Sequence, residues 1–203
     1  MVAGGYAYGY LFVSQNHLAE RTFHELLGIV KPNQILEIGT LHGGLTLMLR
    51  DIMDKLELIN NPIRTYDIND QEFLKPLVID RNVEVLTKNI FNDDYTNFRN
   101  DQSYQELKDF IQKSGTTMVL CDGGCKKCEF NLIAPLLKTH DIIMAHDYAP
   151  DQIYFENYMK DKLWDWLEIQ DSDIEQIVNQ ENLVSFYQDL IQQAAWCCRI
   201  KRS

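Results

Sequence analysis

The chain has 203 residues and a formal net charge of −11, with 45% hydrophobic and 24% charged residues. This composition is that of an ordinary globular protein and excludes a disordered chain. The negative charge argues against a surface that neutralises nucleic-acid phosphates, because such surfaces need clustered Lys and Arg. No run approaches the roughly 18 to 20 apolar residues of a membrane span. We therefore expect a cytoplasmic protein that binds neither nucleic acid nor a membrane.

The chain is predicted to form one domain, 1–203, because no Pro/Gly/Ser-rich linker or change in composition divides it. We distinguish an N-terminal lid or helix (1–30), a ligand-binding core (31–150) and C-terminal helices with a closing strand (151–203). Five cysteines without a secretory signal favour reduced thiols over a disulfide framework. The neighbours Cys197 and Cys198 should point to opposite faces of a strand.

The hydrophobic pattern alternates between helical and extended segments along the chain. Helices are predicted at 14–30, 45–56, 71–77, 104–111 and 126–137. Buried strands are predicted at 34–39, 63–70, 83–89, 116–122 and 141–147. Such alternation predicts a parallel sheet with helices on both faces. Beyond it, 151–168 is predicted helical and 194–201 a strand that returns to the sheet, whereas 168–190 fits either a strand or a helix.

The first strand leads into the loop LEIGTLHGG, where Glu37, Gly39 and Gly43 form the pattern E-x-G-x-x-x-G. In a doubly wound sheet, ligands bind beyond the carboxyl ends of the strands, where the strand order reverses. The loop has neither the dinucleotide pattern G-x-G-x-x-G nor the P-loop pattern that binds phosphates. The alternative to a ligand loop is a generic turn that needs glycine for a positive φ.

The next two strand ends also carry candidate ligand-binding residues. Asp67 closes the second strand, where an acid is suited to binding ribose hydroxyls. A helix N-cap or a solvated loop acid is the alternative for this residue. Asn89, Ile90 and Phe91 follow the third strand and are candidates for contact with an adenine ring.

The segment LCDGGCKKCEF (120–130) places three cysteines beside an aspartate. Cys125 and Cys128 form one C-x-x-C pair, but structural zinc sites commonly use two Cys/His pairs. Zinc binding, with His140, His146 or the distant cysteines recruited, and a redox role near a helix start both stay open. Free thiols packed near a helix are the interpretation we favour, and Asp122 is the better candidate for chemistry.

Asp122 ends the fourth strand and Asp147 ends the fifth, so their side chains should meet at one rim of the sheet. Together with His146 they could hold a divalent cation such as Mg²⁺ or Mn²⁺. A metal there would hold a substrate hydroxyl and lower its pKa. The alternative is that both acids cap the helices that follow.

Two segments, LLGIVKPNQILEIGTLHGGLTLMLRDI and MVLCDGGCKKCEFNLIAPLLKTHDIIMAHDYA, resemble class I S-adenosylmethionine (SAM)-dependent methyltransferases. The resemblance is to the cephalosporin hydroxylase-like and rhamnosyl O-methyltransferase-like family and spans roughly 15–150. It implies a doubly wound, mostly parallel, seven-stranded Rossmann-like α/β sheet and SAM as cofactor. Matching SAM-binding positions are Glu37, Gly39, Gly43 and Asp67, to which we add Thr40, Gly44, Ile68, Asn89, Ile90 and Asp122. Asp122 and Asp147 match acidic metal-ligand positions, and His146 would be the third ligand.

The chain departs from the family pattern in two places. The fourth strand of the family ends in D-S-x-H, whereas Cys125 stands here in place of the histidine. The fifth strand ends in a Glu-Asp pair, whereas His146 replaces the glutamate. Histidine moves the preference of a metal site towards Mn²⁺, Fe²⁺ or Zn²⁺, or it leaves His146 free to act as a base.

We therefore predict a SAM-dependent methyltransferase that methylates a hydroxyl of a small molecule or sugar by in-line displacement. Asp122 is a predicted catalytic residue, and His146 is the first candidate base, followed by Lys126 and His42. Aromatic residues of 4–12 and 154–166 could form a lid and an acceptor pocket, or plain core. A metal-independent O- or N-methyltransferase and an inactive SAM-fold binding module are the alternatives, and assembly into a homo-oligomer stays open.

Overall fold

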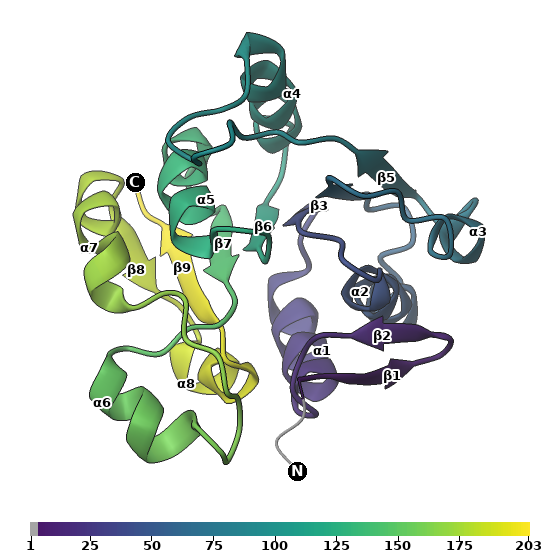
Figure 1. Ribbon diagram of the computed structural model, residues 1–203. Coiled ribbons are helices and arrows are strands. Elements are labelled where there is room, and N and C mark those ends of the chain that lie inside the picture. Colours follow the sequence, from purple (N-terminus) through teal and green to yellow (C-terminus); the bar gives the residue numbers. More distant parts are fainter. Residues whose placement is uncertain (1–3) are drawn as a thin grey trace.

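A central sheet organises the chain, and the computed structural model describes residues 4–203 (Figure 1). Its seven strands are β3 (Gln34–Ile38), β4 (Ile63–Asp67), β5 (Val83–Thr87), β6 (Thr117–Cys121), β7 (Ile142–Ala145), β8 (Leu183–Ser185) and β9 (Cys197–Lys201). They are hydrogen-bonded in the order β5-β4-β3-β6-β7-β9-β8. β3 to β7 pair in parallel, whereas β9 runs antiparallel to both β7 and β8. The predicted doubly wound, mostly parallel, seven-stranded sheet is confirmed.

Helices cover both faces of this sheet. One core cluster joins it to α1 (Ala19–Val30), α2 (Gly44–Lys55) and α8 (Gln188–Ile191). The other core cluster joins it to α4 (Asp101–Ile111), α5 (Lys126–Ile133) and α7 (Asp171–Gln180). The shorter helical segments are α3 (Lys75–Val78), α6 (Gln152–Tyr154), η1 (Ala134–Leu136), η2 (Phe155–Met159) and η3 (Gln192–Ala194). Within 4–203, no helix is both long enough and apolar enough to cross a membrane.

The alternation of strand side chains divides the core into these two clusters. In β3, Leu36 packs in the cluster with α5, whereas Ile35 packs in the cluster with α2. The closing strand repeats the pattern, because Cys197 and Cys198 are both fully buried but lie in different clusters. The two cysteines therefore point to opposite faces of the sheet and cannot serve one site. In both clusters, each fully buried aliphatic side chain contributes roughly 1.5 to 3 kcal/mol to the free energy of folding.

The N-terminal helix and the aromatic tail differ from the sequence prediction. α1 begins at Ala19 rather than at 14, because Asn16 accepts hydrogen bonds from Leu18 N–H through its side chain and from Ala19 N–H through its carbonyl. Of the helix predicted over 151–168, only 152–159 is helical, as α6 and η2. The undecided stretch 168–190 contains α7, β8 and the start of α8.

The expectation of reduced thiols is wrong for two cysteines of the 120–130 segment. Cys125 and Cys128 form a disulfide at the N-terminal end of α5. Neither sulfur can then ligate zinc, because zinc needs thiolates. Cys121, Cys197 and Cys198 stay free and buried. Cys125 follows directly on the glycine turn after Asp122, so the disulfide lies beside the predicted site.

Candidate functional site

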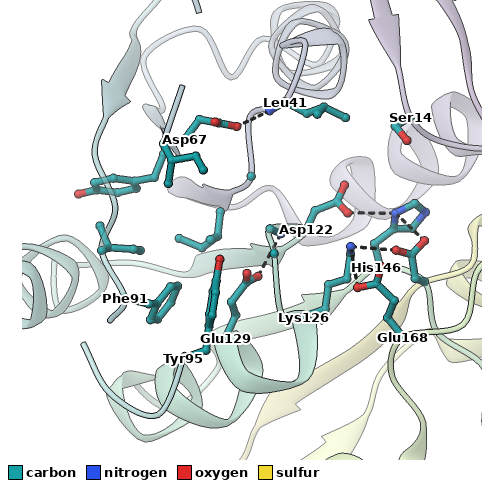
Figure 2. Close-up of a pocket in the computed structure, with 18 of the residues that line it drawn as sticks. Ser14, Leu41, Asp67, Phe91, Tyr95, Asp122, Lys126, Glu129, His146 and Glu168 are labelled. Atoms are coloured by element: carbon teal, nitrogen blue, oxygen red, sulfur yellow. Dashed lines mark hydrogen bonds and ion pairs between the residues drawn. The ribbon is translucent and has the colours of Figure 1, made fainter. Parts of the chain in front are cut away.

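A cavity of about 470 Å³ opens beyond the carboxyl ends of the parallel strands (Figure 2). It lies where the strand order reverses between β3 and β6, which is where ligands bind in doubly wound sheets. Its volume falls within the range of small-molecule sites, roughly 300 to 1,000 Å³. The predicted site residues that line it are Gly39, Asp67, Ile68, Asn89, Ile90, Phe91, Asp122, Lys126, His146 and Asp147.

The glycines of the first loop allow backbone conformations and close contacts that other residues cannot. Gly39 has a φ of 92°, and a Cβ atom there would overlap the carbonyl oxygen of Asp122. Gly43 has a φ of 76°, and its Cβ would lie 2.8 Å from that of Leu74. Only Gly39 of this pair lines the cavity. The loop therefore brings a bare backbone against the start of the 122–125 turn.

Three other predicted SAM-binding residues lie behind this loop rather than in the cavity lining. Thr40 shares a hydrogen bond of 2.6 Å with Thr65 of β4. Gly44 packs so closely against Phe12 that a Cβ would overlap the Phe12 carbonyl oxygen. Glu37 is fully buried beneath the loop and accepts a hydrogen bond of 2.5 Å from Thr46 of α2. These residues shape the loop from the side of the helix.

Burial raises the pKa of Glu37 from 4.5 to about 7, although the Thr46 hydroxyl opposes the shift. A raised pKa in the folded state means that protonated Glu37 favours folding. This contribution is complete below pH 4.5 and is lost as the pH rises towards 7. This difference in the pKa of Glu37 between the folded and unfolded states corresponds to roughly 3 kcal/mol of stability at low pH.

Glu37→Gln should therefore flatten the pH dependence of stability between pH 4.5 and 7.5. Urea unfolding at several pH values measures this effect, with the exposed Glu72→Gln as the matched control. We expect wild type and Glu72→Gln to lose roughly 3 kcal/mol more than Glu37→Gln over that interval. Parallel pH profiles for all three proteins would contradict the assignment.

Asp67 ties the glycine loop to the end of β4 (Figure 2). Its carboxylate accepts hydrogen bonds of 2.7 Å from Leu41 N–H and 2.8 Å from Asn69 N–H. It caps no helix, since the next helix, α3, begins only at Lys75. A carboxylate has about four acceptor positions, so two remain for a ligand in the cavity.

The 122–125 turn is held by residues that the sequence analysis did not select. Glu129 accepts hydrogen bonds of 3.1 Å from both Gly123 N–H and Cys125 N–H. A Cβ on Gly123 would overlap the Glu129 carboxylate, and one on Gly124 would overlap the Tyr95 hydroxyl. Figure 2 shows Tyr95 and Glu129 side by side below this turn. The signal in the sequence was the spacing of Glu129, four residues after Cys125 and in the first turn of α5, where acids bind free N–H groups.

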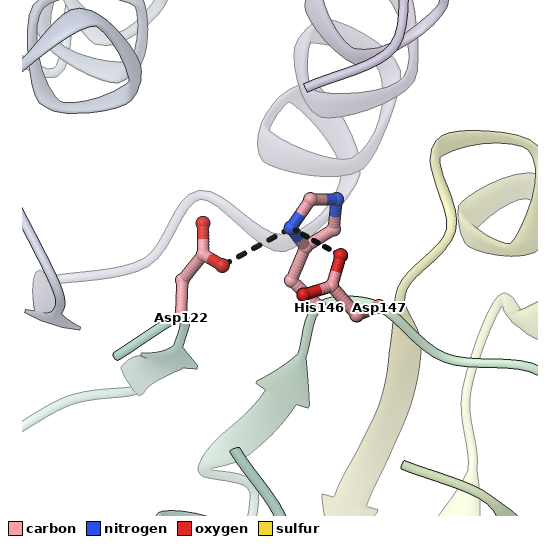
Figure 3. A group of neighbouring side chains, drawn as sticks. All are labelled: Asp122, His146 and Asp147. Carbon is pink, nitrogen blue, oxygen red and sulfur yellow. Dashed lines mark hydrogen bonds and ion pairs between the residues drawn. The ribbon is translucent and has the colours of Figure 1, made fainter. Parts of the chain in front are cut away.

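Asp122, His146 and Asp147 come together at the rim of the cavity (Figure 3). The Nδ1 atom of His146 lies 3.0 Å from Asp122 Oδ1 and 3.4 Å from Asp147 Oδ1. Burial raises the pKa of Asp122 despite the opposing effect of His146. Burial would lower the pKa of His146, but the two carboxylates outweigh it and leave the pKa raised. Neither acid caps a helix, since the N-cap residues of α5 and α6 are Cys125 and Asp151. The three side chains contact one another instead, and the charge of each changes the pKa of its neighbours.

Four further side chains complete the hydrogen bonding of this cluster. Gln15 donates to Asp122 Oδ2 over 2.9 Å and accepts a hydrogen bond of 2.7 Å from the Trp196 indole. The Trp164 indole donates to Asp147 Oδ1 over 2.6 Å. Lys126 lies 2.9 Å from Asp147 Oδ2. None of these long-range pairings is visible in the sequence, although Lys126 was a candidate base.

The arrangement does not fit a divalent cation, even though one potential ligand atom from each of the three residues lies within 4.8 Å of the others. Each oxygen of Asp122 and Asp147 already has a nitrogen atom within 3.0 Å, so a cation would have to compete with four existing contacts. His146 directs Nδ1 at the two carboxylates, 3.0 and 3.4 Å away, so this nitrogen is already engaged with them (Figure 3). A metal would also lie next to the Lys126 ammonium, which would repel it.

Two of the candidate bases, Lys126 and His42, are not suited to that role. Burial would lower the pKa of Lys126, but Asp147, Asp122 and Glu168 raise it overall, so the side chain is a cation and a poor base. His42 is exposed, and its ring packs edge-on against Phe12 outside the cavity lining.

The two predicted aromatic segments lie in different places relative to the cavity. Trp164 and Trp166 line the cavity, and the Trp164 indole donates a hydrogen bond to Asp147. The N-terminal segment forms the hairpin of β1 (Tyr6–Tyr8) and β2 (Leu11–Val13), which packs on α2. From this segment only Gly4 lines the cavity among the described residues. Of the two segments, only the C-terminal one therefore contributes aromatic side chains to the cavity.

Comparison with known proteins identifies the fold. No protein-family model and no curated protein sequence matches the chain. The structure of CmcI-N160 in its apo form is 14% identical, with a TM-score of 0.67 over 98% of this chain and 76% of CmcI. CmcI-D160 with Mg-SAM is 12% identical, with a TM-score of 0.62 over 96% of this chain and 76% of CmcI. An O-methyltransferase from Bacillus cereus in complex with SAH is 12% identical, with a TM-score of 0.51 over 98% and 84%. The chain shares the fold of these proteins.

Proposed function

We propose that the protein is a SAM-dependent methyltransferase that methylates a hydroxyl group of a small molecule or sugar. One observation carries the proposal: Gly39, Asp67 and Asp122, from three neighbouring strand ends, line a single cavity at the point where the strand order reverses. The folds of CmcI and of the Bacillus cereus O-methyltransferase, described with SAM or SAH, support it.

The cofactor would occupy the end of the cavity formed by the glycine loop, β4 and β5. Asp67 keeps two acceptor positions for the ribose hydroxyls, next to the bare backbone of Gly39. The ring of Phe91 faces the cavity near Tyr95, and the two rings are 5.6 Å apart (Figure 2). Asn89 and Ile90 line the same end, which suits a flat adenine ring.

The charge of the cavity suits a cationic cofactor. Five carboxylates line it, from Asp67, Asp122, Glu129, Asp147 and Glu168, against two ammonium groups, from Lys88 and Lys126. Lys88 is paired with Glu106, at 2.6 Å. Clefts lined by one sign of charge attract ligands of the opposite sign. SAM carries a sulfonium and an ammonium group against one carboxylate, so its net positive charge complements this lining.

The acceptor would occupy the other end, between Asp122 and the Trp164–Trp166 segment. Bound SAM would supply an electrophilic sulfonium methyl group to the acceptor's hydroxyl oxygen, with SAH as the neutral leaving group. The hydroxyl proton passes to the hydrogen-bonded pair of Asp122 and His146. A raised pKa brings the Asp122 carboxyl closer to the operating pH, which favours proton transfer.

Methyl transfer from tritium-labelled SAM to a panel of phenols, catechols and sugars tests the activity. Asp122→Asn keeps the shape of the side chain but cannot take up a proton. We expect it to lower kcat by roughly 10² to 10⁴-fold while SAM affinity changes less than about threefold. The exposed Asp109→Asn on α4 is the matched control and should behave like wild type. Transfer that is equally fast in both variants contradicts the role of Asp122.

A further inference from the structure

The side chain of Lys126 lies beside the cluster of Asp122, His146 and Asp147. It is the first residue of α5, and it is only 8% exposed. Its Nζ atom lies 2.9 Å from Asp147 Oδ2 and 3.0 Å from Glu168 Oε2. Figure 2 shows the amine beside Glu168 and facing the side of the cavity that holds His146.

The surroundings of this ammonium are those of a cation site. Asp122, Asp147 and Glu168 all line the cavity around it, and each carries a carboxylate. An ammonium has three N–H donors, and Asp147 and Glu168 use two of them. Among residues 4–203, the third N–H has no hydrogen-bond partner. Since Lys126 lines the cavity, this donor is available to a bound molecule.

We propose that the Lys126 ammonium is the resident cation of the site and replaces a divalent metal in holding the acceptor oxygen. Its third N–H donates to the hydroxyl oxygen and stabilises the negative charge that develops as the proton leaves for Asp122 and His146. Lys126 keeps its own protons throughout, because Asp147 and Glu168 hold the ammonium in place. The proposal rests on the proposed methyl transfer and makes it independent of metal.

Titration with Mn²⁺, followed by the electron paramagnetic resonance signal of the free ion, tests the proposal on protein saturated with SAH. Lys126→Met removes the ammonium and leaves the three carboxylates without their cation. We expect this variant to bind Mn²⁺ at least 100-fold more tightly than wild type. Wild type that binds Mn²⁺ with micromolar affinity, or a folded Lys126→Met that gains no affinity, overturns the proposal.

Two variants control for position and charge. Lys127→Met removes the neighbouring lysine, which is 52% exposed and lies 3.5 Å from Asp173, and it should bind Mn²⁺ as weakly as wild type. Adding Asp147→Asn to Lys126→Met should reduce the gained affinity at least tenfold. Gained affinity that survives this change places the ion elsewhere and overturns the proposal.

A failure to fold and a failure of the proposed function are both distinguishable from a failure of this inference. If Lys126→Met does not fold, Lys126→Gln takes its place, because the amide can still donate to one carboxylate without carrying charge. SAM binding is measured separately by calorimetry. A wild type that does not bind SAM defeats the proposed function, whereas Mn²⁺ titration without SAH still decides whether Lys126 occupies the cation position.

Discussion

Gly39→Ala should destabilise the protein by roughly 2 to 5 kcal/mol and abolish measurable SAM binding. The residue has a φ of 92°, which is strained for alanine, and the added Cβ would overlap the Asp122 carbonyl oxygen. Gly39 follows β3 and Asp122 follows β6, and these two strands are paired. Removing the overlap would therefore require the end of β6 to move away from β3. Urea unfolding and calorimetric titration with SAM measure the two effects.

Gly28→Ala is the matched control for that change. Gly28 lies inside α1, and its added Cβ would meet only a Leu56 methyl group at an ordinary distance of 3.8 Å. Alanine is the better helix former by about 1 kcal/mol, so this variant should be more stable and bind SAM normally. Equal effects of the two substitutions would show that the loop after β3 has no special conformational requirement.

Asp67→Ala should weaken SAM binding by about 10² to 10⁴-fold in a protein that still folds. The variant removes the acceptors for the ribose hydroxyls and also the hydrogen bonds that hold Leu41 and Asn69. Hydrogen bonds to charged groups contribute roughly 1.5 to 3 kcal/mol each, and losing two such bonds to the ligand accounts for the expected range. Calorimetric titration with SAM gives the affinity, and circular dichroism checks the fold.

Asp70→Ala provides the comparison within the same loop. Its carboxylate pairs with Lys75 and Thr87 and does not line the cavity. This variant should bind SAM within about twofold of wild type. An Asp67 variant that binds as tightly as the Asp70 variant would instead assign Asp67 a purely structural role.

The order of strands and helices was predictable from the sequence because each element buries a repeating apolar pattern. Ile35 and Leu36 show this, since consecutive buried residues in a short segment indicate a strand covered on both faces. The start of α1 at Ala19, five residues inside the expected helix, was not predictable. It is set by the hydrogen bonds of Asn16, which the apolar pattern does not show. Helix ends depend on such single contacts, which periodicity does not record.

The candidate site was predictable where its residues follow strands directly. Asp67, Asp122 and Asp147 each stand at a strand end, so their meeting at one edge follows from parallel topology. Gln15 and Trp164 were not predictable, because they lie 107 residues from Asp122 and 17 residues from Asp147 along the chain, respectively. Their pairing depends on how the segments outside the sheet pack against it.

Calorimetric titration of the purified protein with SAM tests the central claim most directly. The account predicts binding to wild type with a dissociation constant of roughly 1 µM to 1 mM, unchanged by EDTA and competed by SAH. SAM at about 100 times that constant should also raise the free energy of unfolding by about 2.7 kcal/mol. A folded wild type that shows neither heat of binding nor stabilisation at millimolar SAM would contradict the account.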